Sequence, residues 1–124
     1  MESENVFVQP KDLEVSMLER ASFLEDVAEQ FQGEYVRIST SGPLSGEARD
    51  CRLSGILVNP LAIVFQMDCD NDSETRYTIA NPERLLARHD NVGELASLEI
   101  VSLDGSVTTV WFEGRRDQRD DVAA

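Results

Sequence analysis

Few side chains in this sequence could do chemistry: one histidine, two cysteines and a run of acidic residues near the middle of the chain. An enzyme nucleophile needs an activating base beside it, and His89 is the only histidine that could supply an imidazole. His89 lies in the polar stretch 88–91 (RHDN), which is typical of a surface histidine. The sequence contains no nucleophile elbow, Walker loop, dinucleotide fingerprint or zinc-protease motif. We therefore predict that the protein is not an enzyme and has no catalytic residues.

The two cysteines do not form a Cys-x-x-Cys motif, and two sulfurs with one histidine are too few for a structural zinc site. They lie in two runs, 47–58 and 61–69, that flank the turn pair at 59–60. Pairing these runs as an antiparallel hairpin places Cys51 opposite Cys69. A disulfide is then geometrically conceivable. We expect buried, reduced thiols instead, because we expect a cytoplasmic protein.

Four acidic residues alternate along 68–74 and invite comparison with a calcium-binding loop. Counted from Asp68, the position of the required glycine holds Ser73, and the position of the bidentate acid holds Ile79. An EF-hand is excluded without that glycine and that glutamate. We predict a solvated turn here, and we predict no metal site and no cofactor.

The net charge is −13, because 24 acidic residues face only 11 basic ones. Binding to nucleic acid draws its affinity from cationic patches, so this charge argues against direct nucleic-acid binding. It argues equally against docking on anionic lipid. The first ten residues carry no targeting signal, and no stretch approaches the roughly 18 apolar residues of a membrane helix. We expect a cytoplasmic protein with no membrane contact.

A helix is predicted from about residue 17 to 32. Ser16 to Glu19 has the S-x-x-E form of a capping box, and Gly33 follows as a C-terminal stop. The apolar residues recur at helical spacing and form one stripe: Met17, Ala21, Leu24, Ala28 and Phe31. The opposite, solvated face carries Glu25, Asp26 and Glu29. We expect Leu24 and Phe31 to be buried against a sheet.

The chain after Gly33 alternates in the manner of β-strands. The expected strands are 35–40, 47–58, 61–69, 75–80, 95–103 and 106–112, while 82–89 could be a short helix or another strand. The sequence thus predicts an α+β fold, with one N-terminal helix packed on five or six antiparallel strands, either as a small bent barrel or as a sheet with the helix across it. The domain spans 16–112, preceded by an extended or disordered segment at 1–15 and followed by a disordered charged tail at 113–124.

Two hairpins carry the most detailed predictions. A three-residue turn in the first hairpin places Leu57 opposite Ile63, Gly55 opposite Phe65 and Leu53 opposite Met67. Asp104-Gly105 marks the turn of the second, C-terminal hairpin. Alternation in that hairpin assigns Leu98, Ile100 and Trp111 to one face and Val101, Leu103, Val110 and Phe112 to the other. Because one helix can cover only one face, we expect the hairpin to leave apolar surface uncovered.

Several short motifs occur in an order that resembles a small family of uncharacterised bacterial proteins, known only as a domain of unknown function. They are Phe23-Leu24 leading to Gly33, Tyr35 to Ser39, Glu47 to Asp50, Leu53-x-Gly55-Ile56, Thr78-Ile79-x-x-Pro82, and Leu98 to Val101 with Asp104-Gly105. Together they span roughly residues 16 to 112. The family often has a tryptophan early in the helix, where this chain has Arg20. The resemblance implies a single domain of one helix plus strands, and it implies no activity.

These observations favour a small, acidic, non-catalytic binding or regulatory domain. It would act through protein–protein contacts, with a protein partner or as a homodimer through the C-terminal hairpin. The alternative is an acidic mimic of nucleic acid that inhibits a basic nucleic-acid-binding protein, which the charge of −13 motivates.

Overall fold

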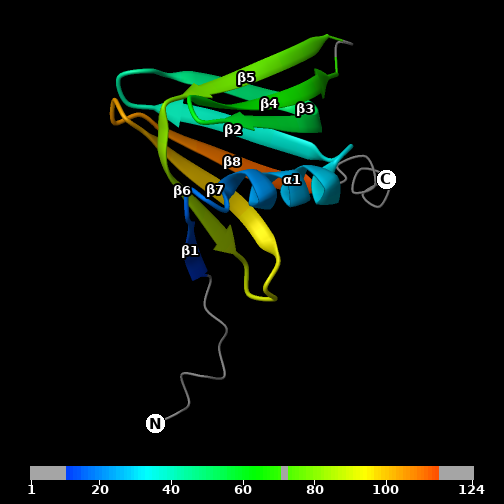
Figure 1. Cartoon of the computed structure of the whole chain (residues 1–124). Helices are drawn as coiled ribbons and strands as arrows, with labels where there is room; N and C mark the ends of the chain where they lie inside the picture. Colours follow the sequence, from blue (N-terminus) through cyan, green and yellow to red (C-terminus); the bar gives the residue numbers. More distant parts are fainter. Residues whose placement is uncertain (1–10, 71–72, 115–124) are drawn as a thin grey trace.

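The computed structural model of the protein describes residues 11–70 and 73–114 (Figure 1). They form β1 (Lys11–Val15), α1 (Arg20–Phe31), β2 (Tyr35–Ser41), β3 (Gly46–Asn59), β4 (Ala62–Cys69), β5 (Glu74–Ala80), β6 (Pro82–His89), β7 (Leu95–Ser102) and β8 (Val107–Gly114). The fold is therefore mostly β, and the predicted α+β class with five or six strands is wrong. The additional strands are β1, which pairs with β6, and β6 itself, which resolves the open assignment of 82–89 as a strand.

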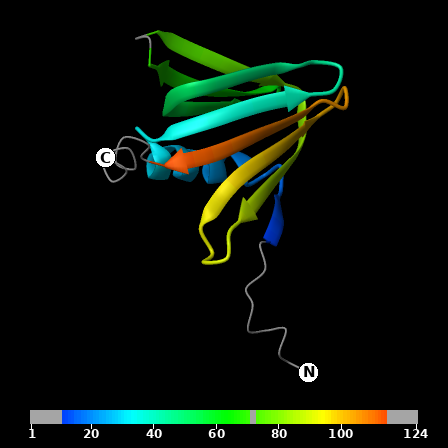
Figure 2. The same cartoon turned by 180° about the vertical axis from the view of Figure 1, so that it is seen from behind.

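All eight strands belong to one antiparallel sheet, in the order β1-β6-β7-β8-β2-β3-β4-β5. Two meanders, β2 to β5 and β6 to β8, are joined where β8 pairs with β2. The sheet is strongly curved, and α1 lies across one of its faces (Figure 1); from behind, the sheet stands in front of the helix (Figure 2). Within the described part of the chain, no helix is long and apolar enough to cross a membrane.

The helix begins three residues later than predicted. The expected capping box does not form: Glu19 occupies the N-cap position without a side-chain cap, and its backbone N–H donates to the Ser16 carbonyl at 3.1 Å. As predicted, Leu24 and Phe31 are buried. Met17 lies outside the helix and is 60% exposed, so the buried stripe does not start there.

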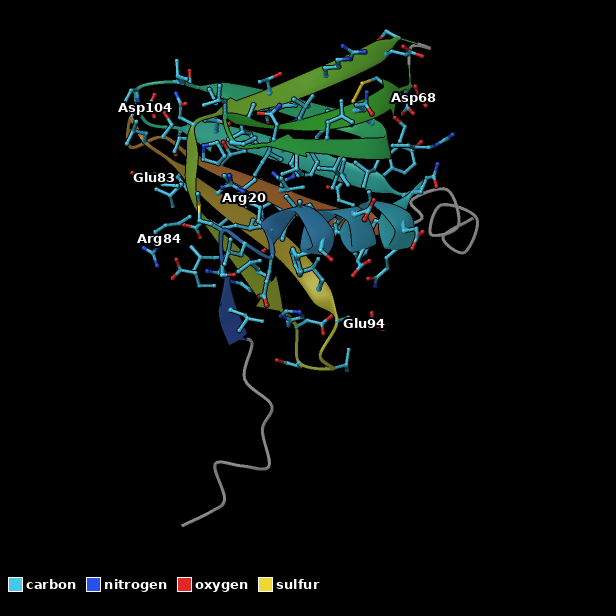
Figure 3. All side chains as sticks on the ribbon, in the orientation of Figure 1. Arg20, Asp68, Glu83, Arg84, Glu94 and Asp104 are labelled. Atoms are coloured by element: carbon cyan, nitrogen blue, oxygen red, sulfur yellow. A yellow bond between two sulfur atoms is a disulfide. The ribbon has the colours of Figure 1, made fainter. Side chains whose placement is uncertain are left out.

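Ala21 is also exposed and Ala28 only partly buried, and the buried helix residues are Arg20, Leu24, Val27 and Phe31, with Arg20 only 5% exposed. Its guanidinium donates to the carbonyl of Pro82, at the start of β6, at 3.2 Å. Figure 3 shows Arg20 between the first turn of α1 and the strands beneath it. A buried cation is costly unless it is hydrogen-bonded, so this bond fixes the N-terminal end of the helix to β6.

The core fills the space between α1 and the sheet. Its fully buried members include Leu24, Val36, Ile38, Leu53, Ile63, Phe65, Met67, Leu85, Leu98, Ile100 and Val110. At the C-terminal end of the helix, Phe31 stacks on Phe112 of β8 with ring centroids 4.2 Å apart. Since offset aromatic pairs add stability beyond their buried area, this contact anchors α1 to β8.

The β3–β4 hairpin follows the predicted register at one end only. Cys51 pairs with Cys69 and Leu53 pairs with Met67, as predicted. A bulge between Leu53 and Gly55 then inserts one residue into β3, so the turn has two residues rather than three. The remaining predicted pairs are wrong: Gly55 lies opposite Gln66, and Leu57 lies opposite Val64. Because a one-residue shift moves side chains to the other face, Leu57 is 50% exposed.

The C-terminal hairpin also differs from its predicted division into faces. In the observed register Val110 lies opposite Leu98, so it shares the buried face with Leu98 and Ile100. Trp111 pairs with Ser97 and belongs to the other face, where the Arg37 guanidinium stacks 4.0 Å from the centre of its ring. The helix covers the first face and polar side chains share the second. The predicted division into faces is therefore wrong, while Val101 and Trp111 on the second face are partly exposed, so the expected uncovered apolar surface stays a prediction.

The predicted terminal segments fall mostly outside the described residues. Within 1–15, the described residues 11–15 form β1, so this part of the segment is an ordered strand. Strand β8 extends through Gly114, two residues into the predicted tail. The rest of the tail, 115–124, lies outside the described residues.

Candidate functional site

Cavities lie beside the free edge of the sheet at β5. Strand β5 is the last strand in the order and pairs only with β4. Strand β3 pairs with both β2 and β4. Its first residues, 46–50, pair with β2 alone, and its pairing with β4 begins at residue 51. Two cavities lie between β5 and the beginning of β3, one at each end of β5.

The larger cavity has a volume of about 430 Å³ and contains the two cysteines in its lining. Cys51 and Cys69 are joined as a disulfide, drawn as a yellow bond close to Asp68 in Figure 3. The predicted proximity on adjacent strands is confirmed, but the sulfurs are bonded where reduced thiols were expected. Cys51 is 2% exposed, while Cys69 is partly exposed.

Backbone geometry brings β3 and the end of β4 together at this disulfide. Asp50 has a positive φ of 60°, within the irregularity that separates the Val36–Cys51 pair from the Ile38–Ala48 pair. Its carbonyl accepts a hydrogen bond from the N–H of Asp70 at 3.1 Å. The carboxylate of Asp70 in turn accepts a hydrogen bond of 3.0 Å from the Tyr35 hydroxyl.

The wall of this cavity is acidic. Among the described residues, its lining includes three acidic residues, Glu47, Asp50 and Asp70, and one basic residue, Arg49. Arg49 forms an ion pair with Glu47, and the hydrogen bond from its guanidinium to that carboxylate raises the pKa of Arg49 above its usual range. The neighbouring neutral groups in the lining are Ser73 and Thr75.

The smaller cavity, of about 290 Å³, includes several hydroxyl residues in its lining, among them Thr40, Tyr77 and Thr108. The hydroxyl of Thr40 lies 2.7 Å from that of Tyr77 and 2.8 Å from that of Thr108, so the three form one hydrogen-bonded chain across β5, β2 and β8. Gly46 makes room for the ring: a Cβ there would lie 3.0 Å from the Tyr77 hydroxyl oxygen. Ligand pockets use such fixed polar groups to orient a bound molecule.

Three exposed leucines gather on the turns at this same end of the molecule, and we call them the leucine patch: Leu44, Leu61 and Leu103, with exposures of 57%, 71% and 66%. Backbone hydrogen bonds hold the turns together. The N–H of Asn81 donates to the Leu61 carbonyl at 2.7 Å, and the N–H of Leu103 donates to the Asn81 carbonyl at 2.9 Å. The Leu44 N–H donates to the Ser106 hydroxyl at 3.0 Å.

Figures 1 and 2 both show the β2–β3 and β7–β8 turns side by side, at the end of the sheet opposite the C-terminal end of β8. The leucines belong to three different connections in the sequence. Each leucine lies on a turn between two strands, and no regular spacing in the sequence links the three. Only the order of the strands in the sheet brings them together.

The other residues considered from sequence do not form a common site. His89 ends β6, in the other meander from the cysteines, and is partly buried. Asp68 and Asp70 are exposed at the end of β4 and just after it, where a solvated turn was expected. Within 11–70 and 73–114, no cluster of His, Cys, Asp or Glu could hold a metal ion. The hydroxyl chain of Thr40, Tyr77 and Thr108 was missed, because isolated hydroxyl residues on three strands carry no sequence signal.

Comparison with known proteins adds no assignment. No family model, curated protein or solved structure matches the chain. The resemblance to a bacterial domain of unknown function therefore stays a prediction.

Proposed function

We propose that this protein is a small non-catalytic binding domain that acts through protein–protein contacts, and that it pairs with a second copy of itself through the leucine patch. The observation that carries the proposal is the convergence of Leu44, Leu61 and Leu103 on hydrogen-bonded turns. A single exposed leucine is ordinary on a protein surface, but adjacent exposed leucines mark interaction sites.

The C-terminal hairpin contributes its turn to this contact. The helix packs on one of its faces, where Phe31 stacks on Phe112, and on the other face the Arg37 guanidinium stacks on the ring of Trp111. Leu103 at the turn is the large apolar residue that the hairpin leaves exposed. The patch can meet its own copy about a two-fold axis, because an isologous contact requires only one self-complementary surface.

The charge of the chain gives this contact a characteristic salt dependence. Each copy carries a net charge of −13, so two copies repel each other at low ionic strength. Screening shortens the range of this repulsion to about 10 Å at 0.1 M salt and about 3 Å at 1 M. The apolar contact itself is not weakened by salt, so dimerisation should tighten as salt is added.

Sedimentation velocity at high micromolar concentration, in low-salt and high-salt buffer, tests the proposal. We expect a larger dimer fraction at high salt for the natural sequence, and loss of the dimer in the double variant Leu61→Asn, Leu103→Asn. Val92→Asn is the matched control, because Val92 is 77% exposed on the β6–β7 turn outside the patch. It should dimerise like the natural sequence. A strict monomer in both buffers, or equal loss in the control, contradicts the homodimer.

A further inference from the structure

The two cysteines of the disulfide differ in exposure. Both cysteines line the larger cavity. Cys69 is partly exposed at the end of β4, whereas Cys51 is 2% exposed within β3. Attack on a disulfide depends on access to the sulfur, so we expect an external thiol to attack the more exposed cysteine, Cys69, first.

The surroundings of Cys51 suit a sulfur that is released and then bonds again. Its Sγ lies 3.2 Å from the carbonyl oxygen of Arg49, which can accept a hydrogen bond from the thiol once the disulfide has opened. The residue between them, Asp50, has a positive φ and a backbone hydrogen bond to Asp70. Because the β3–β4 ladder continues beside the cysteines, the two sulfurs stay close after the bond is broken.

We propose that the Cys51–Cys69 pair is a reversible thiol-exchange site that takes small cationic thiols in preference to anionic ones. This inference is independent of the proposed homodimer. The preference follows from the described lining of the cavity, in which three residues are acidic, Glu47, Asp50 and Asp70, and one is basic, Arg49. The Arg49 guanidinium is already paired with Glu47. The acidic wall therefore attracts a cationic thiol and repels an anionic one.

Reduction of the disulfide proceeds in two thiol–disulfide exchange reactions. The external thiolate attacks the Sγ of Cys69, a new sulfur–sulfur bond forms there, and the bond to Cys51 breaks. Cys51 leaves as a thiolate and takes a proton from solvent. A second external thiolate then attacks the mixed disulfide, so that two molecules of thiol become one small disulfide and the protein becomes a dithiol. The reverse reaction, with a small disulfide as oxidant, restores the Cys51–Cys69 bond.

The rate of reduction of the natural, folded protein tests the charge preference. Cysteamine and 3-mercaptopropionate differ mainly in the sign of their charge. The rate at which each thiol reduces the protein is divided by its thiolate concentration and by the rate at which the same thiol reduces a neutral small disulfide. At low ionic strength we expect cysteamine to react about tenfold faster, from a charge difference acting over several ångströms near the surface. The ratio should fall towards one at about 1 M salt. Alkylation followed by mass spectrometry measures both rates.

A pair of single-cysteine variants tests which sulfur is attacked. With cystamine as the probe, Cys51→Ser leaves Cys69 available and should form a mixed disulfide readily. Cys69→Ser leaves the buried Cys51 and should react at least about tenfold more slowly, because the reaction needs access to the sulfur. Asp50→Asn removes one carboxylate while keeping a residue that tolerates positive φ, and it should reduce the preference for cysteamine.

Three results would overturn the inference. The first is that the natural protein is reduced only under denaturing conditions. The second is that both thiols react at equal normalised rates at low salt. The third is that Cys51 reacts as fast as Cys69. The first measurement uses no variant, so a variant that failed to fold would not leave the inference without a test.

Discussion

Replacing Leu24 with alanine tests how α1 is attached to the sheet. The helix has 12 residues, too short to be stable alone, so its stability depends on the side chains that it buries. Leu24 is fully buried in the middle of the stripe that contains Val27 and Phe31. We expect Leu24→Ala to lower the free energy of unfolding substantially.

The magnitude follows from the groups that the substitution removes. Three carbon atoms are lost, and at about 0.8 kcal/mol for each buried CH₂ the transfer free energy is about 2.4 kcal/mol. A void of roughly 50 Å³ adds about 1.2 kcal/mol, at about 24 cal/mol for each Å³ of cavity that does not collapse. The expected loss is therefore about 3–4 kcal/mol, a large part of the stability of a typical domain.

Urea unfolding, followed by circular dichroism, measures this loss. Leu18→Ala is the matched control, because Leu18 lies just before the helix and is 96% exposed. It should change the free energy of unfolding by no more than about 0.5 kcal/mol. If the two variants unfolded at the same urea concentration, the packing of α1 described above would be wrong.

Two further predictions concern the contacts that hold the ends of the fold. A double-mutant cycle of Phe31→Leu and Phe112→Leu should give a coupling free energy of about 0.5–1.5 kcal/mol from the ring stacking, and additive single effects would contradict that contact. The Arg84 guanidinium donates two hydrogen bonds to the Glu14 carboxylate, at 3.0 and 3.1 Å, and lowers the pKa of Glu14 below its ordinary 4.5. Because the pKa is lowered in the folded state, the ion pair with Arg84 stabilises the fold above pH 4.5. This stabilisation is lost as the pH falls through the pKa of Glu14 in the folded protein. The melting temperature of Glu14→Gln should therefore lie below that of the natural protein at pH 7, and the two should converge in acid; a difference independent of pH would refute this.

Local patterns predicted the elements of this fold better than their geometry. The alternation of apolar residues located β2, β3, β4, β5, β7 and β8, because a half-buried strand repeats every two residues. The same rule failed beyond Leu53, where a bulge adds a residue to β3. Gly55 follows that bulge, and a glycine inside a strand pattern is the one signal that could have suggested it.

The helix was predicted at the right place but with the wrong start. Ser16 and Glu19 fit a capping box, yet Glu19 makes no capping bond and the helix begins at Arg20. An arginine is normally assigned to the solvated side of a helix, since its charge is costly to bury. Here a carbonyl from Pro82, 62 positions along the chain, receives its hydrogen bond. Such a distant partner cannot be inferred from helical spacing.

The candidate sites were predictable only where they depend on one hairpin. The Cys51–Cys69 pair follows from the β3–β4 register alone. The leucine patch and the hydroxyl chain each combine residues from both meanders, so they require the strand order. A single sequence contains no information on the pairing of β2 with β8 that a local pattern could reveal.

The position of β8 has a consequence for how the chain folds. Strands β2 to β5 pair with their neighbours in sequence, and so do β6 to β8, so each meander can form from short loops. The β2–β8 ladder instead joins Tyr35–Ser41 to residues 107–114, at the opposite end of the described chain. Closing so long a loop costs entropy before any contact repays it, and such pairings slow folding. During synthesis on a ribosome, the meander β2 to β5 would emerge before β8. The edge of β2 that pairs with β8 would be exposed until β8 emerged.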